Sequence, residues 1–139
     1  MFVRPLSLSI PFLFVGAVAF AAGHGPLIDY QGLMGSLRAA GAGAEPAGDV
    51  DQPFLSVTGR MIKVHGEDVQ VFQYANAAAA QAETAPISRD GTAVGTRKIH
   101  WVGSPHFYRK GRLVVLYVGD TDKVRRALAA ALGPQFAGK

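Results

Sequence analysis

The stretch Leu113-Val114-Val115-Leu116-Tyr117-Val118 decides the fold of this chain. A strand with one exposed face alternates apolar and polar residues, but this stretch is apolar or aromatic throughout. We therefore expect a central strand with both faces covered. The preceding Lys110-Gly111 pair is typical of a tight turn, and it predicts an antiparallel partner strand over residues 106–109.

Further elements are expected on both sides of this hairpin. Residues 98–102 are extended ahead of it, and a helix over 122–132 follows it. Asp120 or Thr121 supplies the N-cap of that helix. One apolar stripe along the helix is formed by Val124, Leu128 and Leu132.

The same order of elements occurs earlier in the chain. A β-rich segment over 54–64 and a strand over 69–74 flank a turn at 65–67. An alanine-rich helix over 77–84 follows, and Asn76 caps it. These two β-hairpin–helix units predict an α+β fold, in which an antiparallel sheet of about four or more strands carries helices packed on it.

The region ahead of these units predicts one more helix, over residues 28–42, and an acidic connector over 44–52 that is extended or looped. The two helices of the hairpin units can cover one face of the sheet. The other face needs the first helix, the segment around Phe54 or a partner subunit. A homodimer is therefore expected if the first helix packs elsewhere.

The first 21 residues read as a secretory signal peptide. A short head with Arg4 precedes an apolar run over 6–20, which ends in small residues suited to cleavage. We therefore divide the chain into a signal peptide (1–21), a leader with the first helix (22–43) and an α+β domain (44–139) that forms one globular unit with that helix. The expected location is outside the cytoplasm, either secreted or periplasmic.

An uncleaved membrane anchor is the alternative interpretation of this apolar run, because a bilayer is spanned by about 20 apolar residues. The chain contains no cysteine, which excludes thiol catalysis, cysteine-based metal sites and a lipid-modified N-terminal cysteine. The formal net charge of +4 over 139 residues is only mildly basic. Together with export, this charge predicts no nucleic-acid partner.

Residues that could carry chemistry are densest between His100 and Arg112. Five lysines and arginines and no acidic residue lie between Arg97 and Arg112, interleaved with aromatic residues. This pattern suits binding to an anionic lipid or a wall polymer, and it is equally typical of a solvated hairpin tip. The candidate ligand-binding residues are Trp101, His106, Tyr108, Arg109, Lys110 and Arg112.

A metal-binding protein or a hydrolase is an alternative interpretation, with His65, His100 and His106 as its imidazoles. The spacing of these histidines matches no local metal motif. Ser104 lies near His106, but no Gly-x-Ser-x-Gly motif and no phosphate-binding loop occurs. We therefore assign no catalytic residue, no metal ligand and no cofactor, and we favour a protein that is not an enzyme.

Several short segments form a recognisable set: LRAAGA (37–42), EPAG (45–48), QPF (52–54), VQVFQY (69–74), and PHFY (105–108) leading into GRLVVLYVG (111–119). Together they resemble a family of small bacterial secreted or lipid-anchored proteins of unknown function. The resemblance covers residues 33–138 and implies an envelope location and a single domain. It implies no catalytic residues, and the cysteine used for lipid attachment in that family is absent here.

The sequence as a whole predicts a non-enzymatic binding or interaction domain of the bacterial cell envelope. The expected partner is an anionic envelope component or another protein, and membrane contact is an open alternative.

Overall fold

The computed structural model describes residues 28–139, so the expected signal peptide and the start of the leader lie outside the described residues. The elements are α1 (Tyr30–Ala39), β1 (Glu45–Val50), β2 (Gly59–Val64), β3 (Glu67–Gln73), α2 (Ala77–Thr84), β4 (Ala93–Val94), β5 (Arg97–Lys98), β6 (Pro105–Lys110), β7 (Leu113–Val118), α3 (Asp122–Leu132) and β8 (Ala137–Gly138). Within residues 28–139, none of the helices combines the length and the hydropathy that crossing a bilayer requires.

The main sheet of the described residues has six strands in the order β1-β2-β3-β7-β6-β8, and every neighbouring pair is antiparallel. β7 lies in the middle, where Val115 pairs with Val71 of β3 on one side and with Tyr108 of β6 on the other. All residues of β7 except Val118 are buried. The α+β class, the antiparallel sheet and the central position of this strand are therefore confirmed.

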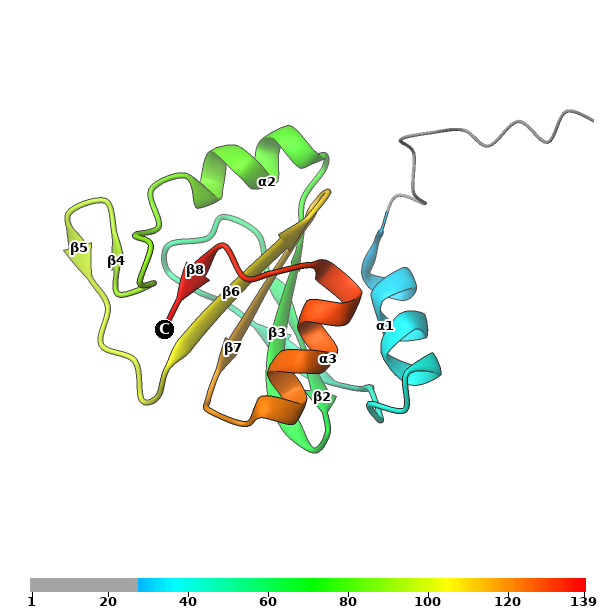
Figure 1. Ribbon diagram of the computed structural model, residues 1–139. Helices are drawn as coiled ribbons and strands as arrows, with labels where there is room; N and C mark the ends of the chain where they lie inside the picture. The colour runs from blue at the N-terminus through cyan, green and yellow to red at the C-terminus, as the bar shows by residue number, and fades with distance from the viewer. Residues whose placement is uncertain (1–27) are drawn as a thin grey trace, which may run out of the picture.

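One face of the sheet is covered by α1 and α3, which pack side by side (Figure 1). Leu37 of α1 and Leu128 of α3 belong to the same buried cluster as Val115 and Tyr117 of β7. The first helix thus packs on the sheet, and the condition under which we expected a homodimer is not met.

The opposite face is covered by α2, by the segment around Phe54 and by the C-terminal residues. Ala80 of α2, Phe107 of β6 and Leu116 of β7 share this second buried cluster. The expectation that the second and third helices share a face is therefore wrong. Adjacent residues of β7 point to opposite faces, so α3 and α2 each have an apolar layer of the sheet to cover.

The acidic connector expected over 44–52 contains an exposed edge strand, β1. Its register with β2 shifts between Pro46 and Asp49. An edge strand tolerates a proline and a bulge that a central strand would not accept, and both features discourage pairing with another chain. Pairing with β2 therefore makes this segment a strand despite its poor strand propensity.

Other boundaries also differ from expectation: the β-rich segment expected over 54–64 is a strand only at Gly59–Val64, and the first helix expected over 28–42 ends at Ala39. The first helix starts at Tyr30, because the side chain of Asp29 caps it by accepting from the backbone N of Gly32 at 2.7 Å. Of the extended stretch expected over 98–102, only Lys98 lies in a strand, β5, which pairs with β4 in a separate two-stranded ribbon.

Candidate ligand-binding site

The six candidate residues do not form one patch, because β6 alternates its side chains between the two faces of the sheet. Tyr108 belongs to the layer under α1 and α3, whereas Arg109 donates to Oγ1 of Thr84 at the end of α2, at 2.7 Å. Lys110 donates to the carbonyl oxygen of Ala131 at 3.3 Å. The expected basic cluster is therefore dispersed over different parts of the surface.

Arg112 and Trp101 lie apart from these residues as well. Arg112 lies 3.8 Å from the carboxylate of Asp29, ahead of α1. The indole N–H of Trp101 donates to the carbonyl oxygen of Gly91 at 2.8 Å. The ring of Trp101 also packs edge-on against Phe107, with centroids 6.0 Å apart, so the indole is partly a core residue.

A cleft of about 520 Å³ lies beside α3, and of the six expected residues it contains only Tyr108. We call it the α3 cleft. It is lined by Tyr108, Asp122, Arg125, Arg126, Ala129, Pro134 and Gln135. Its walls thus come from β6, from α3 and from the segment that leads to β8.

His106 lies buried beside this cleft and fixes one of its walls. Its Nε2 donates to the carbonyl oxygen of Gly119 at 2.9 Å, and its Nδ1 is 2.8 Å from Oε1 of the side-chain amide of Gln135. A neutral imidazole donates through only one nitrogen, so Nδ1 accepts when the amide of Gln135 is turned to present its NH₂ group. Both ring nitrogens are occupied, and His106 is a positioning residue for Gln135.

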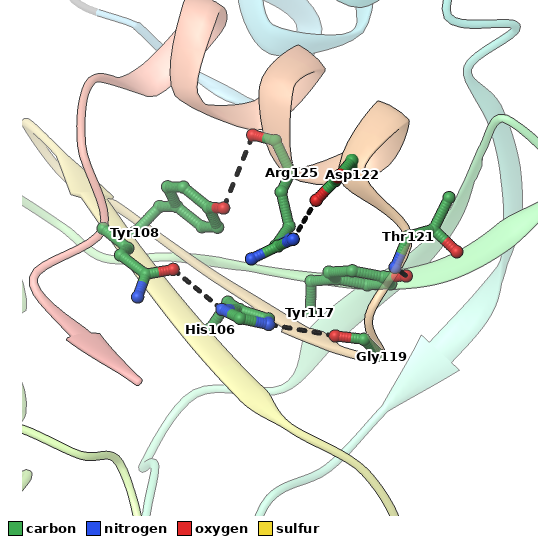
Figure 2. A network of polar contacts seen from close by, with 8 residues as sticks. His106, Tyr108, Tyr117, Gly119, Thr121, Asp122 and Arg125 are labelled. Carbon is green, nitrogen blue, oxygen red and sulfur yellow. Dashed lines mark hydrogen bonds and ion pairs between the residues drawn. The ribbon is translucent and has the colours of Figure 1, made fainter. Parts of the chain in front are cut away.

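Tyr117 joins β7 to the start of α3 beneath the same cleft (Figure 2). Its hydroxyl donates to Oε1 of Glu67 at 2.7 Å and accepts from the backbone N of Thr121 at 3.2 Å. Burial raises the pKa of Tyr117, and the hydrogen bond to Glu67 acts in the same direction. The hydroxyl therefore stays protonated and holds the N-terminus of α3 in place.

Arginine side chains dominate the electrostatics of the α3 cleft. Arg125 forms an ion pair with Asp122, and Arg126 is exposed one position further along α3. The Nε of Arg125 is buried and has no acceptor within the described part of the chain. The cleft thus carries two positive charges against one negative charge, with hydrogen-bonding capacity left unused.

Tyr108 contributes a phenol to the wall of the cleft. Its hydroxyl lies 3.5 Å from the carbonyl oxygen of Arg125, which is too long for a strong hydrogen bond. Burial raises the pKa of Tyr108, although the nearby charge of Arg125 lowers it in part. Tyr108 is therefore a neutral group that can donate to a ligand.

The three histidines of the metal hypothesis do not meet. Among residues 28–139, no group of three histidine, aspartate or glutamate side chains could hold a metal ion. His65 occupies the turn between β2 and β3, with a positive φ of 49°, and His100 lines a hollow near Trp101. His106 is buried elsewhere and already hydrogen-bonded.

Sequence reasoning did not find Arg125, Arg126 and Gln135 as site residues. The two arginines had a detectable signal, since they lie on the polar side of an amphipathic helix. Gln135 had none, because its position depends on the chain folding back after Pro134 to place β8 beside β6.

Comparison with protein-family models, with curated proteins and with solved structures gave no match for this chain. The family resemblance inferred from the sequence therefore stays a prediction.

Proposed function

We propose that this protein is a non-enzymatic binding domain of the bacterial cell envelope, and that it holds a small anionic group in the α3 cleft. The observation that carries the proposal is the pair Arg125 and Arg126 on the wall of a 520 Å³ cleft, where the Nε of Arg125 has no acceptor among the described residues. An arginine matches the geometry of a carboxylate or a phosphate through parallel N–H donors.

The unpartnered Nε of Arg125 supports an anionic ligand in particular. A buried donor without an acceptor costs about 1–3 kcal/mol. A carboxylate or phosphate that reached this Nε would satisfy the donor, while Nη2 of Arg125 kept its ion pair with Asp122. Tyr108 and the amide of Gln135 supply neutral donors beside it.

The binding role is favoured over catalysis because, among the described side chains, the α3 cleft has no histidine or carboxylate free to exchange a proton, and burial keeps the phenol of Tyr108 protonated. His106 has both nitrogens engaged, and Asp122 is paired with Arg125. General acid–base catalysis needs a group within hydrogen-bond reach of the substrate and free to exchange a proton.

The test is a residue-resolved titration with inorganic phosphate and with acetate, followed by ¹H–¹⁵N NMR. We expect shifts concentrated on the side-chain Nε–H groups of Arg125 and Arg126 and on the amide of Gln135. Arg126→Ala should weaken binding about tenfold, whereas Lys123→Ala on the same helix but outside the cleft should leave binding unchanged. Equal effects of the two variants, or shifts spread evenly over the surface, contradict the proposal.

We propose further that the protein is exported and that its fold derives from two similar units. The N-terminal segment supports a secreted or periplasmic protein, and N-terminal sequencing of the natural product tests it: a start at Ala22 supports release, and an intact Met1 supports an anchor. The antiparallel pairing of β2 with β3 and of β6 with β7 supports a fold derived from two β-hairpin–helix units.

A further inference from the structure

A second surface lies around the β4–β5 ribbon and the loop that follows it, away from the α3 cleft. A hollow of about 350 Å³ there is lined in part by Phe54, Arg97, Lys98, His100 and Trp101. Val102 follows directly in the chain. We call this region the ribbon surface, and we propose that it docks onto an anionic phospholipid bilayer.

Val102 gives the ribbon surface an exposed apolar side chain. Its side chain has 104% of its reference accessible area, and it is the only large apolar residue in the exposed class among residues 28–139. A fully exposed valine gains nothing from the fold itself. Beside the partly buried ring of Trp101, it is placed to enter the boundary between lipid headgroups and acyl chains.

Basic side chains give this region its charge. Arg97 and Lys98 are exposed, and no acidic residue lies between Asp90 and Asp120 in the sequence. The carboxylate of Asp90 accepts hydrogen bonds from Ser88 and Thr92, so it is held within its own loop. Basic residues close to an anionic leaflet strengthen membrane binding by about fivefold each.

The position of the ribbon suits contact with a flat surface. Figure 1 shows β4 and β5 at the end of the molecule opposite α1, projecting beyond the main sheet. The hollow behind them is large enough for a phosphate headgroup, with Lys98 and His100 on its wall. The hollow shares no lining residue with the α3 cleft, so the two sites can be occupied together.

Trp101 makes the proposal directly testable, because it is the only tryptophan in the chain. The protein is mixed with vesicles of phosphatidylcholine alone, or with 30% phosphatidylglycerol, both containing lipids brominated on the acyl chains. Quenching of Trp101 reports contact at this surface even if another segment of the chain enters the bilayer. We expect quenching with the anionic vesicles only, and its loss at high salt.

Variants then separate this surface from general electrostatic attraction. Lys98→Glu should weaken binding to anionic vesicles by at least about fivefold, and Val102→Ser should reduce quenching. Lys123→Glu, which makes the same charge change on α3, should leave both unchanged. The side chains of Lys98 and Val102 are exposed, so circular dichroism should show intact folds.

Three results would overturn the proposal. The first is equal quenching by neutral and anionic vesicles. The second is an equal loss of binding in Lys98→Glu and Lys123→Glu. The third is tight binding to an anionic wall polymer without any quenching by brominated lipid, which would assign the ribbon surface to a polymer instead.

Discussion

The imidazole of His106 stacks on the ring of Tyr117, with centroids 5.9 Å apart and an interplanar angle of 22°. The two residues are directly paired across β6 and β7, and both are almost completely buried. Each also ties its strand to another element, His106 to the segment before β8 and Tyr117 to the start of α3. This pair therefore positions two of the three walls of the α3 cleft, the one formed by α3 and the one formed by the segment before β8.

A phenylalanine at position 106 tests this structural role. His106→Phe keeps an aromatic ring against Tyr117 but removes both hydrogen bonds, which leaves the carbonyl of Gly119 and the amide of Gln135 without a partner. We expect a loss of about 1–3 kcal/mol in the free energy of unfolding, measured by urea denaturation. His100→Phe, at an exposed position, is the matched control and should change the free energy of unfolding by less than about 0.5 kcal/mol. Similar losses in both variants would disprove the role.

The central strand should be sensitive to truncation on both of its faces. Val115 faces the layer under α1 and α3, and Leu116 faces the layer under α2. Leu116→Ala should cost about 2–5 kcal/mol, and Val115→Ala somewhat less because fewer methyl groups are lost. Val118, at the less buried end of β7, provides the control. A negligible effect at either buried position would show that one face is not a packed core.

Two glycines should respond in opposite directions to alanine. An ideal Cβ at Gly59 lies 2.5 Å from Cε1 of Phe72, a fully buried ring, so Gly59→Ala should destabilise the protein by about 1–3 kcal/mol. At Gly35, inside α1, the added Cβ meets no atom within 4 Å. Gly35→Ala should therefore stabilise the protein by about 0.5–1 kcal/mol, through helix propensity. Thermal denaturation should show a lower melting temperature for Gly59→Ala and a higher one for Gly35→Ala than for the parent protein.

Elements with a local sequence pattern were predicted correctly. Elements that depend on pairing with residues distant in the chain were not. The helix bounds 77–84 and 122–132 are correct: the side chain of Asn76 caps the first of these helices, whereas Thr121 occupies the N-cap position of the second without a side-chain hydrogen bond. β1 was expected only as an extended or looped connector, since Pro46 and Gly48 oppose a strand until β2 supplies hydrogen bonds.

The site was harder to predict than the fold, because the alternation of β6 separates residues that are adjacent in sequence. Arg109 and Lys110 face different helices, so a run of charges in the sequence does not become a patch. The α3 cleft instead combines Tyr108 with residues of α3 and of the C-terminal segment. No local sequence pattern predicts that Gln135 lies beside His106 in the fold.

Acid should weaken the attachment of the segment around Phe54 to α2, and Glu83 is the group responsible. Its carboxylate accepts hydrogen bonds from the backbone N and the hydroxyl of Ser56, and from the hydroxyl of Tyr74 at 3.0 Å. Partial burial raises the pKa of Glu83, but these hydrogen bonds outweigh it and hold the pKa below the ordinary value of 4.5.

A carboxylate whose pKa is lower in the folded state stabilises the fold above the unfolded value, and this stabilisation is lost as the pH falls through the folded value. Glu83→Gln should therefore be less stable than the parent at pH 7, by about 1 kcal/mol. The difference should shrink as the pH falls below about 4.5. Glu45→Gln on the exposed strand β1 is the matched control. Urea denaturation between pH 3 and 7 measures these slopes, and a Glu83→Gln profile parallel to that of the parent would refute the assignment.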